Sequence, residues 1–144
     1  MTSTDLTIVV ENWLNSGVAV LRLEIDKGAV ALVRHSCGVA CRAAIPLSAP
    51  LDEHMLEQAL QLAEAARHQF HDETAMLSMS PQDEQLWLWM RHEPDDAFRL
   101  CRSLETLLNQ RDAWLGLLSP AIRTAAAVPL NLNTLVFLQG EQHA

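Results

Sequence analysis

The sequence predicts an α+β fold, an antiparallel five-stranded sheet with three helices in the chain order α-β-β-β-α-β-β-α. Three observations support this fold class. In three long segments the apolar residues recur every three or four positions, which is the helical period. Five short segments have the two-residue alternation or the residue types of strands. Turn-forming residues separate consecutive strands, so that neighbouring strands can pair as hairpins.

The first half of the chain predicts one helix and three strands. The helix is expected over residues 5–15, where the apolar residues share one helical face; these are Leu6, Val9, Val10, Trp13 and Leu14. Residues 19–26 and 28–35 follow as two strands, joined by a turn in which Gly28 is expected to adopt a positive φ. A third strand is expected over residues 38–45, where a proline follows it.

The second half predicts a helix, two strands and a final helix. Residues 51–70 have a helical pattern without Gly or Pro inside it. Two strands are expected over 74–80 and 84–91, separated by the turn sequence Pro-Gln-Asp at 81–83. The last helix is expected over 95–118, because a proline precedes it and two aspartates stand in its first turn, where the helix dipole favours negative charge.

The length and composition predict one folded domain over residues 1–120 and an apolar C-terminal tail over 121–144. Hydrophobic residues make up 49% of the chain and charged residues 19%, which is typical of a globular protein. The 10 Lys and Arg against 18 Asp and Glu give a net charge of -8, which repels phosphate and anionic lipid. We therefore expect neither nucleic acid nor a membrane as a partner.

The N-terminal segment predicts a cytoplasmic protein. No basic residue precedes its apolar stretch, so it lacks the pattern of a signal peptide. No apolar run approaches the roughly 18 residues that a transmembrane helix needs. The three cysteines are few and odd in number, which favours reduced thiols over a disulfide framework.

Candidate catalytic and metal-binding residues give weak signals. His68 and His71 have a ligand-like spacing, but two histidines do not complete a tetrahedral site, so no metal is expected. Cys37 and Cys41 lie too far apart on a strand to share a metal, and with Cys101 they are expected to be small core residues. The sequence has no nucleotide-binding loop and no nucleophile motif. We expect no enzyme activity and no cofactor.

Two segments carry more apolar surface than one core contact requires. In the helix over 51–70 the apolar arc extends beyond an ordinary core stripe to Leu56, Leu60 and Ala63. Trp87 and Trp89 point away from the leucines of their own strand, so both faces of that strand are apolar. Either the helix is embedded between sheet and neighbouring helix and the tail covers the tryptophans, or these residues form a dimer interface.

The segment from Pro50 to Leu118 resembles the class I, CesT-like chaperones of bacterial type III secretion. The residues that carry the resemblance are Leu86, Leu88, Trp89, Leu104, Leu107, Leu108, Asn109, Gln110, Arg111, Ala113, Trp114 and Leu118. The likeness covers the chain from about Asp5 to Leu118, in the same order of helices and strands. It implies a homodimer that forms through its middle helix, here residues 51–70, and that binds a secreted protein without ATP.

The resemblance leads to specific expectations. The protein is expected to be a cytosolic chaperone or chaperone-like adaptor whose partner is an effector or a secretion-regulatory protein, and a structural or regulatory subunit of the secretion machinery is the alternative. The expected dimer interface contains Leu56, Leu60, Ala63, Trp87 and Trp89. The expected partner-binding residues are Trp13, Val20 and Arg22. The apolar tail is expected either to pack over the tryptophans or, through residues such as 130–138, to occupy the chaperone's own groove by strand addition until the partner displaces it.

Overall fold

The computed structural model describes residues 2–93 and 96–118. Its elements follow the predicted order, with one additional 3-10 helix, η1. They are α1 (Ser3–Ser16), β1 (Val20–Ile25), β2 (Gly28–His35), β3 (Gly38–Ala44), α2 (Glu53–Phe70), η1 (His71–Glu73), β4 (Met76–Ser80), β5 (Gln85–His92) and α3 (Ala97–Leu118). The predicted tail over 121–144 lies outside the described residues. The predicted α+β fold class is confirmed.

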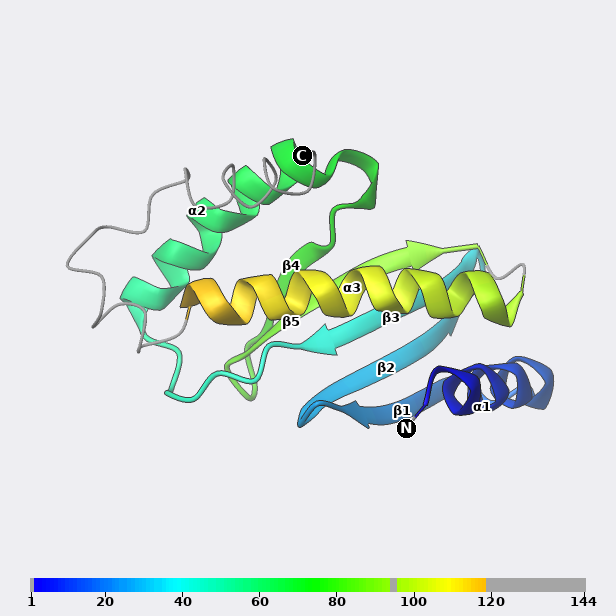
Figure 1. Ribbon diagram of the computed structural model, residues 1–144. Helices are drawn as coiled ribbons and strands as arrows, with labels where there is room; N and C mark the ends of the chain where they lie inside the picture. The colour runs from blue at the N-terminus through cyan, green and yellow to red at the C-terminus, as the bar shows by residue number, and fades with distance from the viewer. Residues whose placement is uncertain (1, 94–95, 119–144) are drawn as a thin grey trace.

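The five strands form one antiparallel sheet in the order β1-β2-β3-β5-β4. Helix α3 lies across one face of this sheet and contacts β3 and β5, and α1 packs beside it (Figure 1). Helix α2 lies next to α3 at the end of the molecule (Figure 1). All three helices therefore lie on the same side of the sheet or at its end, and no helix of the described residues covers the other face.

The hydrophobic core fills the space between the sheet and the helices. Because side chains alternate along a strand, one set from each strand points into this layer. The fully buried residues of this set include Leu32, Cys41, Ala43, Leu86 and Leu88. Helix α3 supplies Leu100, Leu104 and Leu107 from positions three and four apart, which places them on one helical face.

Side-chain caps fix where α1 and α2 begin. The Thr2 hydroxyl accepts a hydrogen bond from the backbone N–H of Asp5, and the Asp5 carboxylate accepts one from the Thr2 backbone, which is a capping box. The Asp52 carboxylate accepts a hydrogen bond from the Met55 N–H at 2.7 Å. Gly17 ends α1 with a φ of 74°, a conformation that glycine adopts without steric cost.

The turn between β1 and β2 differs from the prediction. The positive φ values belong to Asp26 (51°) and Lys27 (64°), so the expectation for Gly28 was wrong. Gly28 is needed for another reason, because a Cβ at this position would lie 2.7 Å from Nη1 of Arg111. Arg111 is 1% exposed, and its Nη1 donates a hydrogen bond to the Ile25 carbonyl at 3.1 Å. This arginine joins α3 to the end of the β1–β2 hairpin.

Gln110, the residue before Arg111, joins α3 to the other edge of the sheet. Its Oε1 accepts a hydrogen bond from the Ala75 N–H at 2.9 Å, and its Nε2 donates one to the Glu73 carbonyl at 2.7 Å. The side chain is 3% exposed and satisfies two backbone groups just before β4 begins. Two adjacent polar residues of α3 therefore hold opposite edges of the sheet.

The three cysteines have different environments. Cys41 is fully buried in β3, as predicted, and burial raises the pKa of its thiol to about 12. Cys101 is partly buried on α3, and burial raises the pKa of its thiol as well. Cys37 was expected in the core but is exposed, because it precedes Gly38 in the turn between β2 and β3 rather than in the strand.

Candidate partner-binding surface

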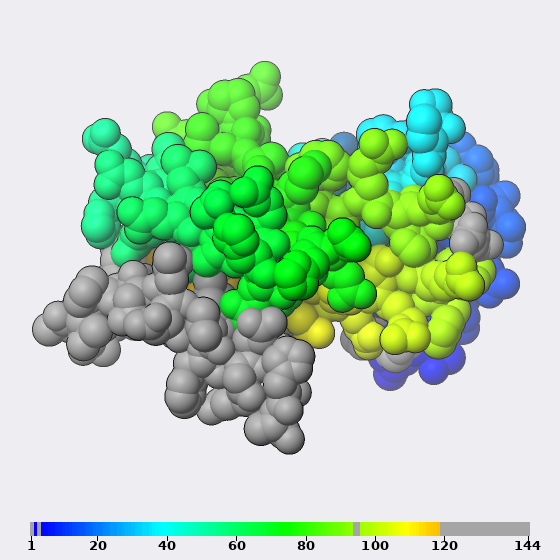
Figure 2. Space-filling view, turned by 90° about the horizontal axis from the view of Figure 1, so that it is seen from above, coloured from blue at the N-terminus to red at the C-terminus, as the bar shows by residue number. Residues whose placement is uncertain are grey.

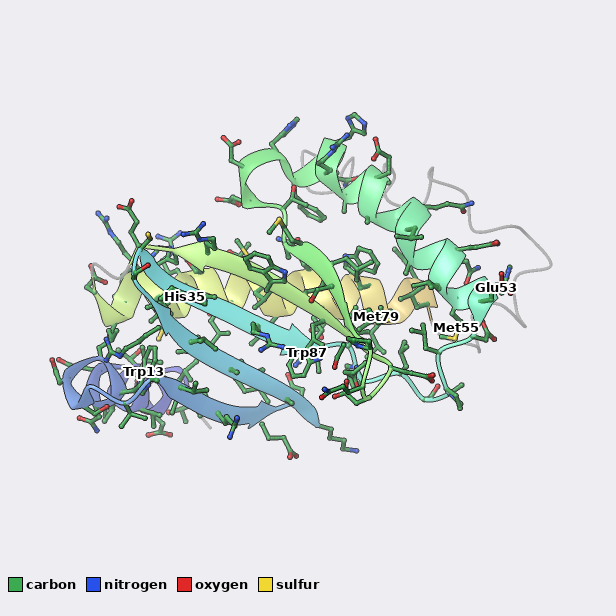
Figure 3. The ribbon with its side chains drawn as sticks, turned by 180° about the vertical axis from the view of Figure 1, so that it is seen from behind. Trp13, His35, Glu53, Met55, Met79 and Trp87 are labelled. Carbon is green, nitrogen blue, oxygen red and sulfur yellow. The ribbon has the colours of Figure 1, made fainter. Side chains whose placement is uncertain are left out.

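The face of the sheet opposite α3 carries a mixed row of large and small side chains, and we call it the open face. Residues directly opposite each other in antiparallel strands lie on the same face. The pairing of the strands therefore places one row across all five of them, namely Arg22, Ala31, Arg42, Trp89 and Met76. In the described part of the chain no helix lies over this face (Figure 3).

Trp87 lies near the middle of the open face (Figure 3). The guanidinium of Arg42 lies over its ring, 4.7 Å from the centroid, which is a cation–π contact. Ala40 and Ala44, which flank Arg42 in β3, are only 3% and 6% exposed. Alanine is too small to reach past its neighbours, so the large side chains around it form the surface of this face.

Trp89 follows two residues later in β5. It is partly buried and pairs with Met76 of the edge strand β4, which is 49% exposed. Both tryptophan rings keep part of their surface in contact with solvent, so their burial is incomplete. The open face therefore retains apolar surface that a second polypeptide can cover.

Helix α2 presents a second apolar surface. Its core-facing residues are Met55, Ala59, Leu62 and Ala66. Leu60 points away from that stripe and is 60% exposed, and Leu56 and Ala63 are half-buried. A leucine this exposed in the middle of a helix is a poor surface residue for an isolated protein, so this side of α2 is a candidate for contact with another chain.

The predicted partner-binding residues are not brought together. Arg22 is exposed and shares the open-face row with Arg42 and Trp89, and Val20 is half-buried on the same face. Trp13 is 4% exposed inside the core, so it is not part of the open face.

Arg34 explains why Trp13 is inaccessible. Its guanidinium lies 4.6 Å from the Trp13 ring centroid and donates hydrogen bonds to the carbonyls of Trp13 and Leu14, both at 2.7 Å. A third bond joins Arg34 to the Val18 carbonyl at 3.0 Å. Arg34 thus satisfies the C-terminal carbonyls of α1, which have no partner within the helix.

Sequence reasoning missed two residues of the open face, Arg42 and Met76. The signal for Arg42 was its place between alanines in a buried strand. A long charged side chain there extends from the sheet so that its charged group reaches solvent. Met76 gave no comparable signal, because only the register between β4 and β5 places it beside Trp89.

The described residues suggest neither a metal centre nor a membrane span. No group of three or more His, Cys, Asp or Glu residues within 2–93 and 96–118 could hold a metal ion. In the same part of the chain, no helix is both long enough and apolar enough to cross a bilayer.

Comparisons with known proteins give structural but no sequence matches. No protein-family model matches the chain, and no curated protein matches it significantly. A chain of the crystal structure of the ExsC-ExsE complex matches with a TM-score of 0.61 and 15% identity, over 83% of this chain and 98% of that chain. A chain of the HopA1-SchA chaperone-effector complex gives 0.54 and 13%, over 78% and 92%.

A third match is a chain of the heterodimeric complex ExoU-SpcU from the type III secretion system of Pseudomonas aeruginosa. Its TM-score is 0.52 at 20% identity, over 78% of this chain and 97% of that chain. Together the three likenesses show that the chain has the fold of class I type III secretion chaperones. The resemblance seen in the sequence is confirmed at the level of the fold.

Proposed function

We propose that the chain is a chaperone or chaperone-like adaptor of a bacterial type III secretion system, which binds an effector or a secretion-regulatory protein in the cytosol. The observation that carries this proposal is the open face, where Trp87, Trp89 and Met76 lie around Arg42 and where no helix within residues 2–93 and 96–118 covers them. Two of the similar structures support it, because one is a chaperone-effector complex and the other is a complex from a type III secretion system.

The open face suits an extended polypeptide. The row from Arg22 to Met76 crosses five strands, which is about 19 Å at a strand spacing of about 4.8 Å. Such a surface offers large side chains beside small ones, and β1 and β4 are its edge strands, to which an extended segment can add as a further strand. The sequence has no nucleotide-binding loop, so binding without ATP is part of the proposal.

The working form in this proposal is a homodimer. The proposed contact between copies contains Leu56, Leu60 and Ala63 on the exposed side of α2, together with Trp87 and Trp89 of the open face. Val20 and Arg22, at the opposite edge of the sheet, remain available to the partner. Trp13 has no direct role here, because it is buried.

Co-purification tests the proposal. The tagged chain is expressed in a bacterium that has a type III secretion system, and the soluble and membrane fractions are separated before purification. A chaperone is expected in the soluble fraction, with one secreted or regulatory polypeptide bound to a dimer of the chain. Recovery of the chain with the membrane-bound secretion apparatus and with no secreted polypeptide would contradict the proposal.

A further inference from the structure

A cavity of about 410 Å³ lies between η1, the end of β5 and the first turns of α3. It exists because β4 pairs with β5 only as far as Trp89, so the last three residues of β5 extend beyond β4. In Figure 2 the residues of η1 (green) lie beside the first turns of α3 (yellow-green). The volume is within the range of sites that bind small groups.

Three arginines line this cavity, which is a local concentration of positive charge in a chain of net charge -8. Arg91 comes from β5, and Arg99 and Arg102 come from α3. No residue in 2–93 or 96–118 forms an ion pair or a side-chain hydrogen bond with the guanidinium of Arg91 or Arg102. Arg34 and Arg111, by contrast, donate to backbone carbonyls. The donors of Arg91 and Arg102 are therefore available to a ligand.

His92 also lines the cavity and links β5 to α3. Its Nδ1 lies 3.0 Å from the hydroxyl of Ser103, which also lines the cavity. The Nε2 atom of His92 is buried, so the arginines remain the cavity's groups for an anionic ligand.

The charge balance of the cavity indicates the size of the ligand's charge. Asp72 and Glu73 of η1 also line the cavity, and Asp96 forms an ion pair with Arg99 at 3.8 Å, which leaves Arg91 and Arg102 as the arginines without a carboxylate partner. A singly charged carboxylate suits these two guanidinium groups, whereas a phosphate near pH 7 carries up to two negative charges and would be repelled by Asp72 and Glu73.

The surroundings of the cavity indicate that this carboxylate belongs to a polypeptide. Phe98 is 65% exposed and lies one helical turn before Arg102, on the same side of α3. An exposed phenylalanine beside a charged pocket can contact an apolar side chain of a segment in which apolar and acidic residues alternate. A free anion has no apolar group for this contact.

We propose that this arginine pocket binds an Asp or Glu side chain of the partner polypeptide. A guanidinium can hold a carboxylate through two parallel hydrogen bonds, and Arg91 and Arg102 have these donors unused. The pocket continues from Trp89 along β5, so an acidic residue there would follow an apolar segment on the open face. This inference rests on the proposed function.

The test uses the full chain and two synthetic peptides, acetyl-Phe-Glu-Leu-Glu amide and its counterpart with Gln in place of both Glu. Binding is followed by the Nε–Hε resonances of the arginines in nitrogen-15 NMR spectra. The Glu peptide is expected to shift the resonances of Arg91 and Arg102, and the Gln peptide is not. Arg102→Gln is expected to weaken binding about tenfold or more, because a charge-assisted hydrogen bond is lost.

Lys27→Gln is the matched control, since Lys27 is also an exposed cation but lies in the turn between β1 and β2, outside both the cavity and the open-face row. It is expected to leave peptide binding unchanged. Equal weakening by Lys27→Gln, or no shift with the Glu peptide, would contradict the proposed pocket. Inorganic phosphate as a third probe is expected to bind more weakly than the peptide, and tighter binding of phosphate at Arg91 and Arg102 would overturn the carboxylate assignment.

Two further checks distinguish a failure of the pocket from a folding defect and from a failure of the proposed function. Arg91→Gln repeats the test on β5 in case Arg102→Gln alters the fold, which circular dichroism would detect. Because the peptides replace the partner, the result does not depend on the co-purification experiment. A chain that still co-purifies with a secreted polypeptide but ignores the Glu peptide would retain the proposed function and lose only the pocket.

Discussion

The two faces of the sheet are built from the same strands but differ in how deeply their side chains are buried. In β5, Leu86 and Leu88 are 0% exposed because α3 covers them, whereas Trp87 and Trp89 alternate with them and are only half-buried. Both faces carry apolar residues, yet the described helices cover one of them. The difference shows that sequence alternation alone does not separate the core from the second face, for which we propose contact with another chain.

The largest expected effect is a difference in stability between a substitution on the covered face and one on the open face. Leu88→Ala removes a fully buried side chain and is expected to lower the free energy of unfolding by about 2 to 5 kcal/mol. Trp89→Ala, one residue later, is expected to cost less, because Trp89 is partly exposed and its removal leaves no closed cavity. Urea denaturation of the two variants measures both values. Equal losses would mean that the two faces are equally part of the core.

Arg111 provides a second test on the covered side. Arg111→Leu leaves the Ile25 carbonyl without its donor and is expected to lower the free energy of unfolding by about 1 to 3 kcal/mol. Gly28→Ala is expected to destabilise as well, because the added Cβ meets Nη1 of Arg111 at 2.7 Å.

The double variant Gly28→Ala with Arg111→Leu shows whether the two residues act on each other. Its loss of stability is expected to be smaller than the sum of the two single losses, because the steric conflict disappears with the guanidinium. Additive losses in denaturation experiments would show that Gly28 is required for a different reason.

Much of this architecture could be predicted from the sequence. The order of helices and strands follows from local periodicity, and the predicted boundaries agree with the structure to within about two residues at most elements. Features that depend on register or on distant contacts were not predictable. The pairing of Met76 with Trp89, the cover of Arg34 over Trp13 and the bond from Arg111 to Ile25 join residues far apart in the chain.

In the candidate site, too, some features could be predicted from the sequence and others could not. The apolar excess of Leu60, Trp87 and Trp89 was visible in the sequence, because it follows from helix and strand periods. The arginine pocket was not visible, because Arg91 and Arg102 line one cavity only as a result of the packing of α3 against β5. Cys37 was misplaced although the strand begins at Gly38 as predicted, because Cys37 lies in the turn before it and was counted with the strand.

Substitutions on the exposed side of α2 test the proposed dimer contact and not the stability of the fold. Leu56→Glu with Leu60→Glu is expected to convert a dimer to a monomer, because charges there would be buried at the contact. Light scattering with size-exclusion chromatography measures the mass. His54→Glu, on the polar side of the same helix, is the control and is expected to leave the dimer intact. An unchanged dimer in the double variant would place the contact elsewhere.

The smallest expected effect is a difference in the reaction rates of the cysteines. These rates distinguish buried from exposed positions without any substitution. Cys37 is expected to react with iodoacetamide within minutes near pH 8, Cys101 more slowly, and Cys41 only on unfolding, because its pKa is raised to about 12. Mass spectrometry of timed samples gives the order. Early labelling of Cys41 would show that α3 does not seal the covered face.

The same raised pKa predicts the direction of a pH effect. The Cys41 thiol of the unfolded chain ionises near its ordinary value of 9.0, but the buried thiol does not until about pH 12. Between these values the unfolded state binds fewer protons than the native state, so stability falls as the pH rises. Cys41→Ala is expected to reduce the slope of the free energy of unfolding in that window, and an unchanged slope would contradict the assignment.

Photo-crosslinking tests the central claim most directly, namely that another polypeptide covers the open face. The photoreactive residue p-benzoylphenylalanine replaces Trp89 on the open face or, as a control, Ile8, which is exposed on α1. In cells with an active type III secretion system, the residue at position 89 is expected to crosslink strongly to a second copy of the chain or to one secreted protein. Crosslinking at position 89 no stronger than at position 8 would contradict the account.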